Sequence, residues 1–141
     1  MLLRSDAEVA LDEALLAAAD AGRLYREAAF KCQSPVRPQL ADAGVLRERI
    51  AEELAEAARR AGWLPRAPDP DAEAARALGD DIQTAIAGEC DAPLLEERRR
   101  ADQATLEKLR AVLATDGVPD HVREIASRHL EQLNVSAQDA P

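Results

Sequence analysis

The stretch LDEALLAAADAGRLYREAAFKC, residues 11–32, decides the fold because its apolar positions recur at alternating steps of four and three. The positions with this spacing are Leu11, Leu15, Ala18, Gly22, Tyr25, Ala29 and Cys32. Such steps place side chains on one face of an α-helix. The stretch therefore predicts a long amphipathic helix that buries one continuous stripe.

The limits of this helix are also marked in the sequence. Ser5 and Glu8 have the spacing of a capping box, in which the serine oxygen accepts from an early amide. Ser34-Pro35 ends the pattern, so we expect a helix over about residues 5–33. The small residues at its middle, Ala18 and Gly22, favour close approach of a neighbouring helix.

Four further segments have helical patterning. The predicted ranges are about 35 or 38 to 61, 71–87, 92–115 and 119–134. The segment 71–87 is the weakest, because its stripe is narrow and Gly79 lies at its middle. The proline-rich stretch 63–71 is typical of a linker, and the tail 135–141 is expected to be disordered.

The connections predict how the helices are arranged. Short connections join the first helix to the second and the third core helix to the last, so the members of each pair should be antiparallel neighbours. About thirty residues separate the second and third core helices, and a 17-residue helix there would span roughly 25 Å. We therefore expect a single domain over residues 1–141, with a core over about 5–134. Its predicted fold is all-α, a ferritin-like four-helix bundle with a long helical crossover.

Composition excludes several classes of partner. The chain has 141 residues, a net charge of -9 and 2% aromatic residues. A negative field repels phosphates, so we expect no nucleic acid and no anionic membrane as a partner. No apolar run approaches the roughly 20 residues of a membrane span. The expected location is cytoplasmic.

The two cysteines, Cys32 and Cys90, do not form a disulfide framework. Cys32 falls on the apolar stripe near a helix end, so we interpret it as a buried structural residue. With a crossover, both cysteines would lie at the same end of the bundle. A disulfide between them is nevertheless not expected in a reducing cytosol.

A resemblance to a known family rests on four segments. They are AAADAGRLYREAA (17–29), RERIAEEL (47–54), LLEERRRADQATLEKLRAVL (94–113) and VPDHVREIASRHLEQL (118–133). Together they resemble an uncharacterised bacterial family of ferritin-like four-helix-bundle proteins, over about residues 10–133. The wider ferritin-like superfamily implies a dinuclear carboxylate metal site.

The sequence lacks the ligands of such a site. Di-iron bundles use Glu-x-x-His on two helices, and this chain contains no such motif and only two histidines, His121 and His129. The superfamily pattern would place a ligand glutamate seven residues before the inward Tyr25, where this chain has Ala18. The remaining metal hypothesis is a mononuclear iron or manganese site made by Glu53, Asp102 and His129, with no spacing that fixes it.

Other polar residues have competing interpretations. Arg47, Arg98 and Asp102 either flank the core with their charges in water, or form a buried pair in which Asp102 meets one of the arginines. The rest of the run EERRRADQ (96–103) is interpreted as paired surface charge. Trp63 either caps one end of the bundle or, with Leu64, contacts a partner.

The leading functional hypothesis is a non-enzymatic, self-associating helical bundle that has lost its metal site and needs no cofactor. Self-association is expected because a last helix of about 16 residues would leave part of the long first helices uncovered. The alternatives are a metal-binding, oxidoreductase-type bundle and an adaptor that binds a partner helix.

Overall fold

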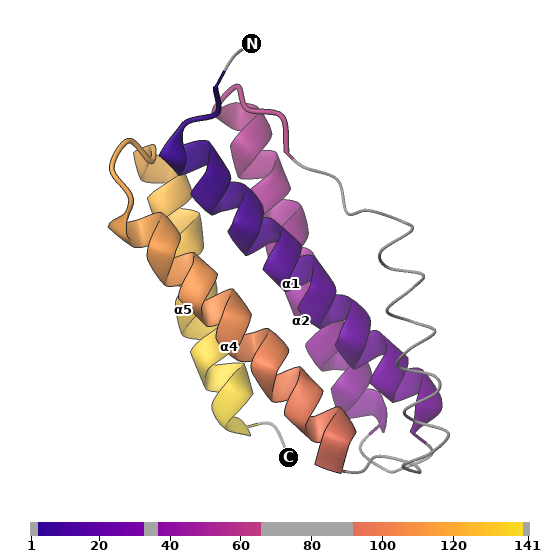
Figure 1. Cartoon of the computed structure of the whole chain (residues 1–141). Helices are drawn as coiled ribbons and strands as arrows, with labels where there is room; N and C mark the ends of the chain where they lie inside the picture. Colours follow the sequence, from indigo (N-terminus) through magenta and orange to yellow (C-terminus); the bar gives the residue numbers. More distant parts are fainter. Residues whose placement is uncertain (1–2, 33–36, 66–91, 140–141) are drawn as a thin grey trace.

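The computed structural model describes residues 3–32, 37–65 and 92–139. In these ranges it consists of α-helices, without strands, as Figure 1 shows. The helices are α1 (Asp6–Lys31), α2 (Arg37–Arg60), α4 (Ala92–Ala114) and α5 (Asp120–Asp139). The predicted all-α class is confirmed. The helix expected over 71–87 lies outside the described residues.

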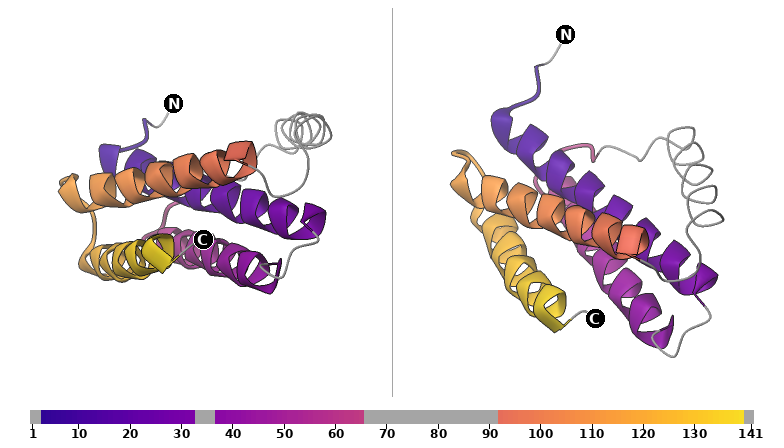
Figure 2. Two further views of the ribbon diagram at one scale, coloured as in Figure 1. Left: turned by 90° about the horizontal axis from the view of Figure 1, so that it is seen from below. Right: turned by 60° about the horizontal axis from the view of Figure 1, so that its bottom comes forward.

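The four helices pack side by side as a bundle. One layer holds α1 and α4, and the other holds α2 and α5 (Figure 2). Each of α1 and α5 packs against both α2 and α4. Helices α2 and α4 run in the same direction, so Arg60 and Ala92 lie at opposite ends of the bundle (Figure 1).

The start of α1 has the predicted cap. The backbone N–H of Glu8 donates to Ser5 Oγ at 3.2 Å, and the hydroxyl of Ser5 lies 3.4 Å from Glu8 Oε1. The cap satisfies one of the amides that a helix start leaves without an intrahelical partner. At the other end, the backbone N–H of Cys32 donates to Ala28 O at 2.9 Å.

Helices α1 and α2 cross closely at two glycines. A Cβ atom on Gly22 would lie 2.8 Å from Glu48 Cγ and 3.1 Å from the Glu48 backbone nitrogen. On Gly44 it would lie 3.2 Å from the backbone nitrogen of Arg26. The sequence indicated the small residue on α1, whereas its counterpart Gly44 on α2 was not anticipated. The lack of side chains at these two positions allows the two backbones to approach closely.

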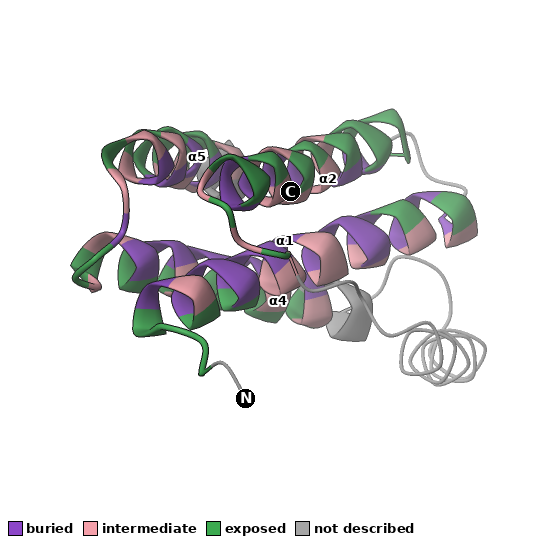
Figure 3. Ribbon diagram, turned by 90° about the horizontal axis from the view of Figure 1, so that it is seen from above, coloured by how far each residue is buried: buried purple, intermediate pink, exposed green. Residues whose placement is uncertain are grey.

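Buried residues line the space between the layers (Figure 3) and form two apolar clusters. The larger cluster includes Leu11, Ile50, Leu54, Leu109 and Val122. The smaller one contains Tyr25, Ala28, Ala29, Cys32 and Leu40. Charged residues are buried among these helices as well, and they form the candidate site described below.

Helix α5 corrects the sequence-based expectation. It ends at Asp139 rather than near residue 134, so residues 135–139 are helical and their predicted disorder is wrong. One physical reason is Ser136, whose hydroxyl accepts a 3.3 Å hydrogen bond from Arg47 Nη1. With 20 residues, α5 covers more of its neighbours than a 16-residue helix would. The short last helix was the reason to expect an uncovered apolar stripe on the first two helices, and the observed length of α5 removes that reason.

The turn before α5 is held by Arg123. Its guanidinium donates to three backbone oxygens, those of Leu113 at 2.7 Å, Thr115 at 2.9 Å and Val118 at 3.2 Å. Leu113 belongs to the last turn of α4, where carbonyls lack intrahelical donors and a cation is favourable.

Among the described residues, no helix is long and apolar enough to cross a membrane.

Candidate functional site

A charged cluster lies inside the bundle where three helices meet. Arg47 of α2 is fully buried, and Tyr25 of α1 and Asp102 of α4 are 3% and 4% exposed. The heptad-like patterning of each helix turns these positions inward, although two of them carry a full charge. Burial of a charge is unfavourable unless a partner and hydrogen bonds compensate for it.

The compensation is complete for the arginine. Its Nε donates to Asp102 Oδ1 at 2.7 Å and its Nη2 donates to Asp102 Oδ2 at 2.8 Å, which is a bidentate pair. Nη2 also donates to the hydroxyl of Tyr25 at 3.3 Å, and Nη1 donates to Ala43 O at 2.8 Å and to Ser136 Oγ at 3.3 Å. A guanidinium has five N–H groups, and all five have an acceptor here.

The carboxylate is equally enclosed. Tyr25 donates its hydroxyl proton to Asp102 Oδ2 at 2.5 Å, so that oxygen accepts from both the phenol and the guanidinium. The Arg47 guanidinium carbon lies 4.0 Å from the centre of the Tyr25 ring, a cation–π contact. Burial raises the pKa of Tyr25 above its usual value, and the adjacent Asp102 carboxylate adds to the rise. The phenol therefore remains a hydrogen-bond donor.

A second buried polar group lies between α5 and α2. His129 is 1% exposed, and its Nε2 contacts Glu53 Oε2. Its Nδ1 lies 3.1 Å from Gln132 Oε1, and Arg128 Nη2 donates to the same Glu53 oxygen at 3.0 Å. Burial lowers the pKa of His129 below its usual value, although Gln132 and Glu53 oppose the shift. The neutral imidazole is therefore favoured in the fold.

These residues do not fit a metal centre of the ferritin-like kind. In the ranges that the structure covers, no three histidine, cysteine or carboxylate side chains come together as a ligand set. The structure brings Glu53 and His129 together, but it does not group Asp102 with them. Both oxygens of Asp102 are occupied by Arg47 and Tyr25, and the guanidinium would repel a cation.

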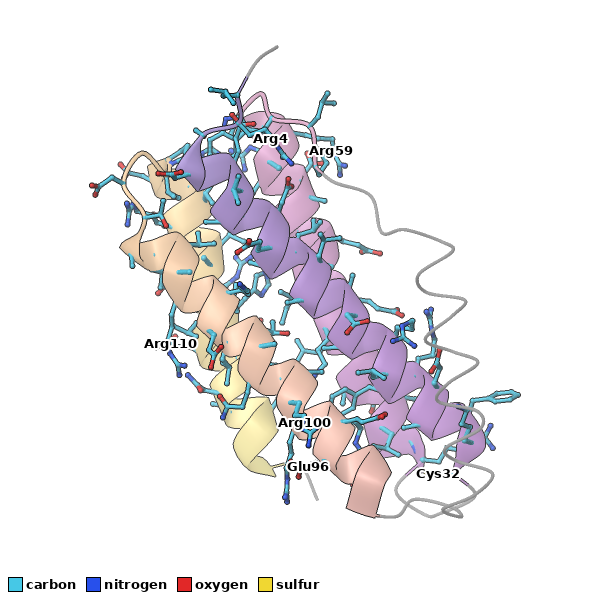
Figure 4. All side chains as sticks on the ribbon, in the orientation of Figure 1. Arg4, Cys32, Arg59, Glu96, Arg100 and Arg110 are labelled. Atoms are coloured by element: carbon cyan, nitrogen blue, oxygen red, sulfur yellow. The ribbon has the colours of Figure 1, made fainter. Side chains whose placement is uncertain are left out.

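The other sequence-predicted residues have distinct environments. Arg98 is 8% exposed and its guanidinium carbon lies 5.7 Å from the Tyr25 ring centre. Trp63 packs partly buried against the larger apolar cluster, while Leu64 is 87% exposed. Glu96 and Arg100 lie on the first half of α4 (Figure 4), 3.6 Å apart and exposed, as expected for a surface pair.

Cys32 differs from its prediction in one respect. It is fully buried at the end of α1 (Figure 4), but it is disulfide-bonded, so the expectation of a reduced thiol is wrong. The end of α1 and the start of α4 lie at the same end of the bundle (Figure 1). Cys90, the other cysteine of the chain, lies outside the described residues.

Two members of the central cluster were missed from the sequence. The sequence pattern identifies Tyr25 only as part of the apolar stripe, and it assigns Ser136 to a tail that is expected to be disordered. The signal for Tyr25 was its hydroxyl, because a buried tyrosine usually hydrogen-bonds to a partner. Ser136 carried no comparable signal, since it lies beyond the last strong apolar position.

Comparison with family models, with curated proteins and with solved structures finds no match for this chain.

Proposed function

We propose that this chain is a non-enzymatic helical bundle that acts by self-association, with a ferritin-like arrangement whose metal site has been replaced by a structural ion pair. The observation that carries the replacement of the metal site is the bidentate contact of Arg47 with Asp102. The guanidinium occupies the buried carboxylate of Asp102, which could otherwise have served a metal. The resemblance to an uncharacterised bacterial family belongs to the same proposal.

The chemistry of the cluster supports a structural role. A catalytic acid or base needs a proton that can reach a substrate, and a nucleophile needs an accessible lone pair. Here the phenol proton is directed at Asp102, both carboxylate oxygens accept hydrogen bonds, and every N–H of Arg47 is used. The arrangement stabilises one packing of α1, α2 and α4 and offers no group to a substrate.

The surface supports an interaction at one end of the bundle. Leu3 is 91% exposed and Leu64 is 87% exposed. Arg4 Nη2 lies 3.4 Å from the carbonyl oxygen of Leu64, so the two apolar side chains belong to neighbouring segments. Arg4 also forms ion pairs with Glu8 and Asp12. This end, where Arg4 and Arg59 lie (Figure 4), is the proposed contact with a second copy.

Light scattering during size-exclusion chromatography tests the proposal over a range of protein concentrations. We expect the wild type to run as an oligomer, and Leu3→Asp with Leu64→Asp to shift it to a monomer. Phe30→Asp is the matched control, because Phe30 is 78% exposed on α1 but near its other end. A monomeric wild type at all concentrations contradicts self-association. In that case, a stable heteromeric complex would support the adaptor hypothesis instead.

The cytoplasmic location expected from the sequence belongs to this proposal, and Cys32 argues against it. Disulfides persist in oxidising compartments and are rare where thiols are kept reduced. Alkylation of the unfolded, unreduced chain distinguishes the two situations. Full alkylation of Cys32 after purification without oxidant would support a reducing compartment, and complete protection would exclude the reduced form.

A further inference from the structure

Among the described residues, the buried cation Arg98 forms no ion pair. Arg98 of α4 is 8% exposed, and its Nη1 is buried without a hydrogen-bond partner among the described residues. Its recorded contact is with the ring of Tyr25, whose centre lies 5.7 Å from the guanidinium carbon. Burial lowers the pKa of the Arg98 guanidinium below its usual value, and the charge of nearby Arg47 contributes to the lowering.

The neighbouring carboxylate cannot provide the missing charge. Asp102 lies one helical turn after Arg98, but its two oxygens already accept from Arg47 and Tyr25. One positive and one negative charge cancel in that pair. Besides burial, Tyr25 and Asp102 raise the pKa of Arg98, whereas Arg47 and Arg99 lower it. Because Arg47 and Asp102 neutralise each other, the charge of Arg98 has no counterion among the described residues.

An uncompensated buried charge is strongly unfavourable, which favours any anion that reaches it. We propose that Arg98 is the recognition residue of an anion site between α4 and α1, and that the site takes a small oxyanion such as a carboxylate or phosphate group. Nη1, which has no hydrogen-bond partner, would donate to the anion, and the centre of the Tyr25 ring lies 5.7 Å from the guanidinium carbon.

The ligand chemistry follows from the donor. A guanidinium matches the paired oxygens of carboxylate and phosphate, whereas a spherical halide accepts from it without that match. The net charge of -9 opposes the approach of any free anion. Binding is therefore expected to be modest in low salt and to need titration at constant ionic strength, because salt screens the field of the exposed carboxylates.

Calorimetric titration and thermal unfolding in acetate, phosphate and chloride test the site on the full chain. We expect acetate or phosphate, but not chloride, to bind saturably and to raise the unfolding temperature of the wild type. Arg98→Met should weaken that binding roughly tenfold or more, since a hydrogen bond to a charged group is lost. The relative response to acetate and phosphate identifies which oxyanion the site prefers.

Arg99→Met is the matched control, because Arg99 is the next residue on α4 and is exposed. It should leave the anion response unchanged. A wild type that does not distinguish the oxyanions from chloride, or an equal loss in both variants, would overturn the proposal.

The anion-free buffer provides a second readout. There, Arg98→Met should unfold at the same temperature as the wild type or higher, because it removes an uncompensated charge and keeps an apolar side chain of similar length. A clearly lower unfolding temperature would mean that a group of the chain already pairs with Arg98, which would refute the site.

Discussion

Replacement of Asp102 by asparagine tests the energetics of the buried cluster. The variant keeps the shape of the side chain but removes its charge, so the fully buried guanidinium of Arg47 loses its counterion. Breaking a buried ion pair by removing one partner costs about 3–5 kcal/mol. Because a domain of this size has a free energy of unfolding of about 5–15 kcal/mol, the loss is a large fraction of its stability.

Urea unfolding followed by circular dichroism measures this loss. With a denaturant dependence of about 2 kcal/mol per molar, a loss of 4 kcal/mol lowers the unfolding midpoint by roughly 2 M. Asp42→Asn is the matched control, because Asp42 is an exposed aspartate on α2. Its free energy of unfolding should stay within about 0.5 kcal/mol of the wild type. An equally small change for Asp102→Asn would show that Arg47 does not depend on Asp102 as its counterion.

A triple variant separates the cost of breaking the cluster from its net contribution. Arg47→Met, Asp102→Leu and Tyr25→Phe together remove both charges and the hydroxyl that depends on them. Replacing a buried ion pair by apolar residues of similar volume is often neutral or stabilising. We expect the triple variant to be more stable than Asp102→Asn alone. If the triple variant has as low a free energy of unfolding as Asp102→Asn, the charged cluster stabilises the fold more than apolar residues of similar volume do.

Three further changes address the helix crossing and the two titrating groups. Gly22→Ala should destabilise the fold by about 1 kcal/mol, because overpacking exceeds the gain in helix propensity, and a rise in the urea midpoint would contradict the tight crossing. Burial raises the pKa of Tyr25, the only tyrosine of the chain. The contribution of Tyr25 to the free energy of unfolding should therefore be fully present below about pH 10 and decrease above it. Tyrosinate absorbance appearing before helicity is lost would disprove this. Burial lowers the pKa of His129, so stability should fall as the pH drops below about 6.5. His129→Gln should reduce the pH dependence of the urea unfolding midpoint, whereas His121→Gln should leave it unchanged. If His121→Gln reduces the pH dependence and His129→Gln does not, His129 is not its source.

The fold was largely predictable because helical periodicity is a local signal. The stripe from Leu11 to Cys32, the cap at Ser5 and the short connections lead to antiparallel helices. The helix ends were less predictable. Residues 135–139 look like a polar tail, and Ser136 meets Arg47 across a separation of 89 residues, which no local pattern reveals.

The candidate site was predictable in part. Inward positions identify Arg47, Arg98 and Asp102, but periodicity gives only the face of a helix and not the rotation and height that bring two faces together. The sequence left open which arginine meets Asp102. The structure places Arg47 there and leaves Arg98 against the ring of Tyr25. Arg47 reaches Asp102 from α2, whereas Arg98 lies on the same helix as Asp102.

In the proposed function, the buried carboxylate of Asp102 serves an ion pair and not a metal. Metal analysis of the chain, purified after expression with added iron and manganese and then dialysed, tests this role. We expect substoichiometric metal in the wild type and the same trace amount in Asp102→Asn. Stoichiometric iron or manganese in the wild type that disappears in Asp102→Asn would contradict it.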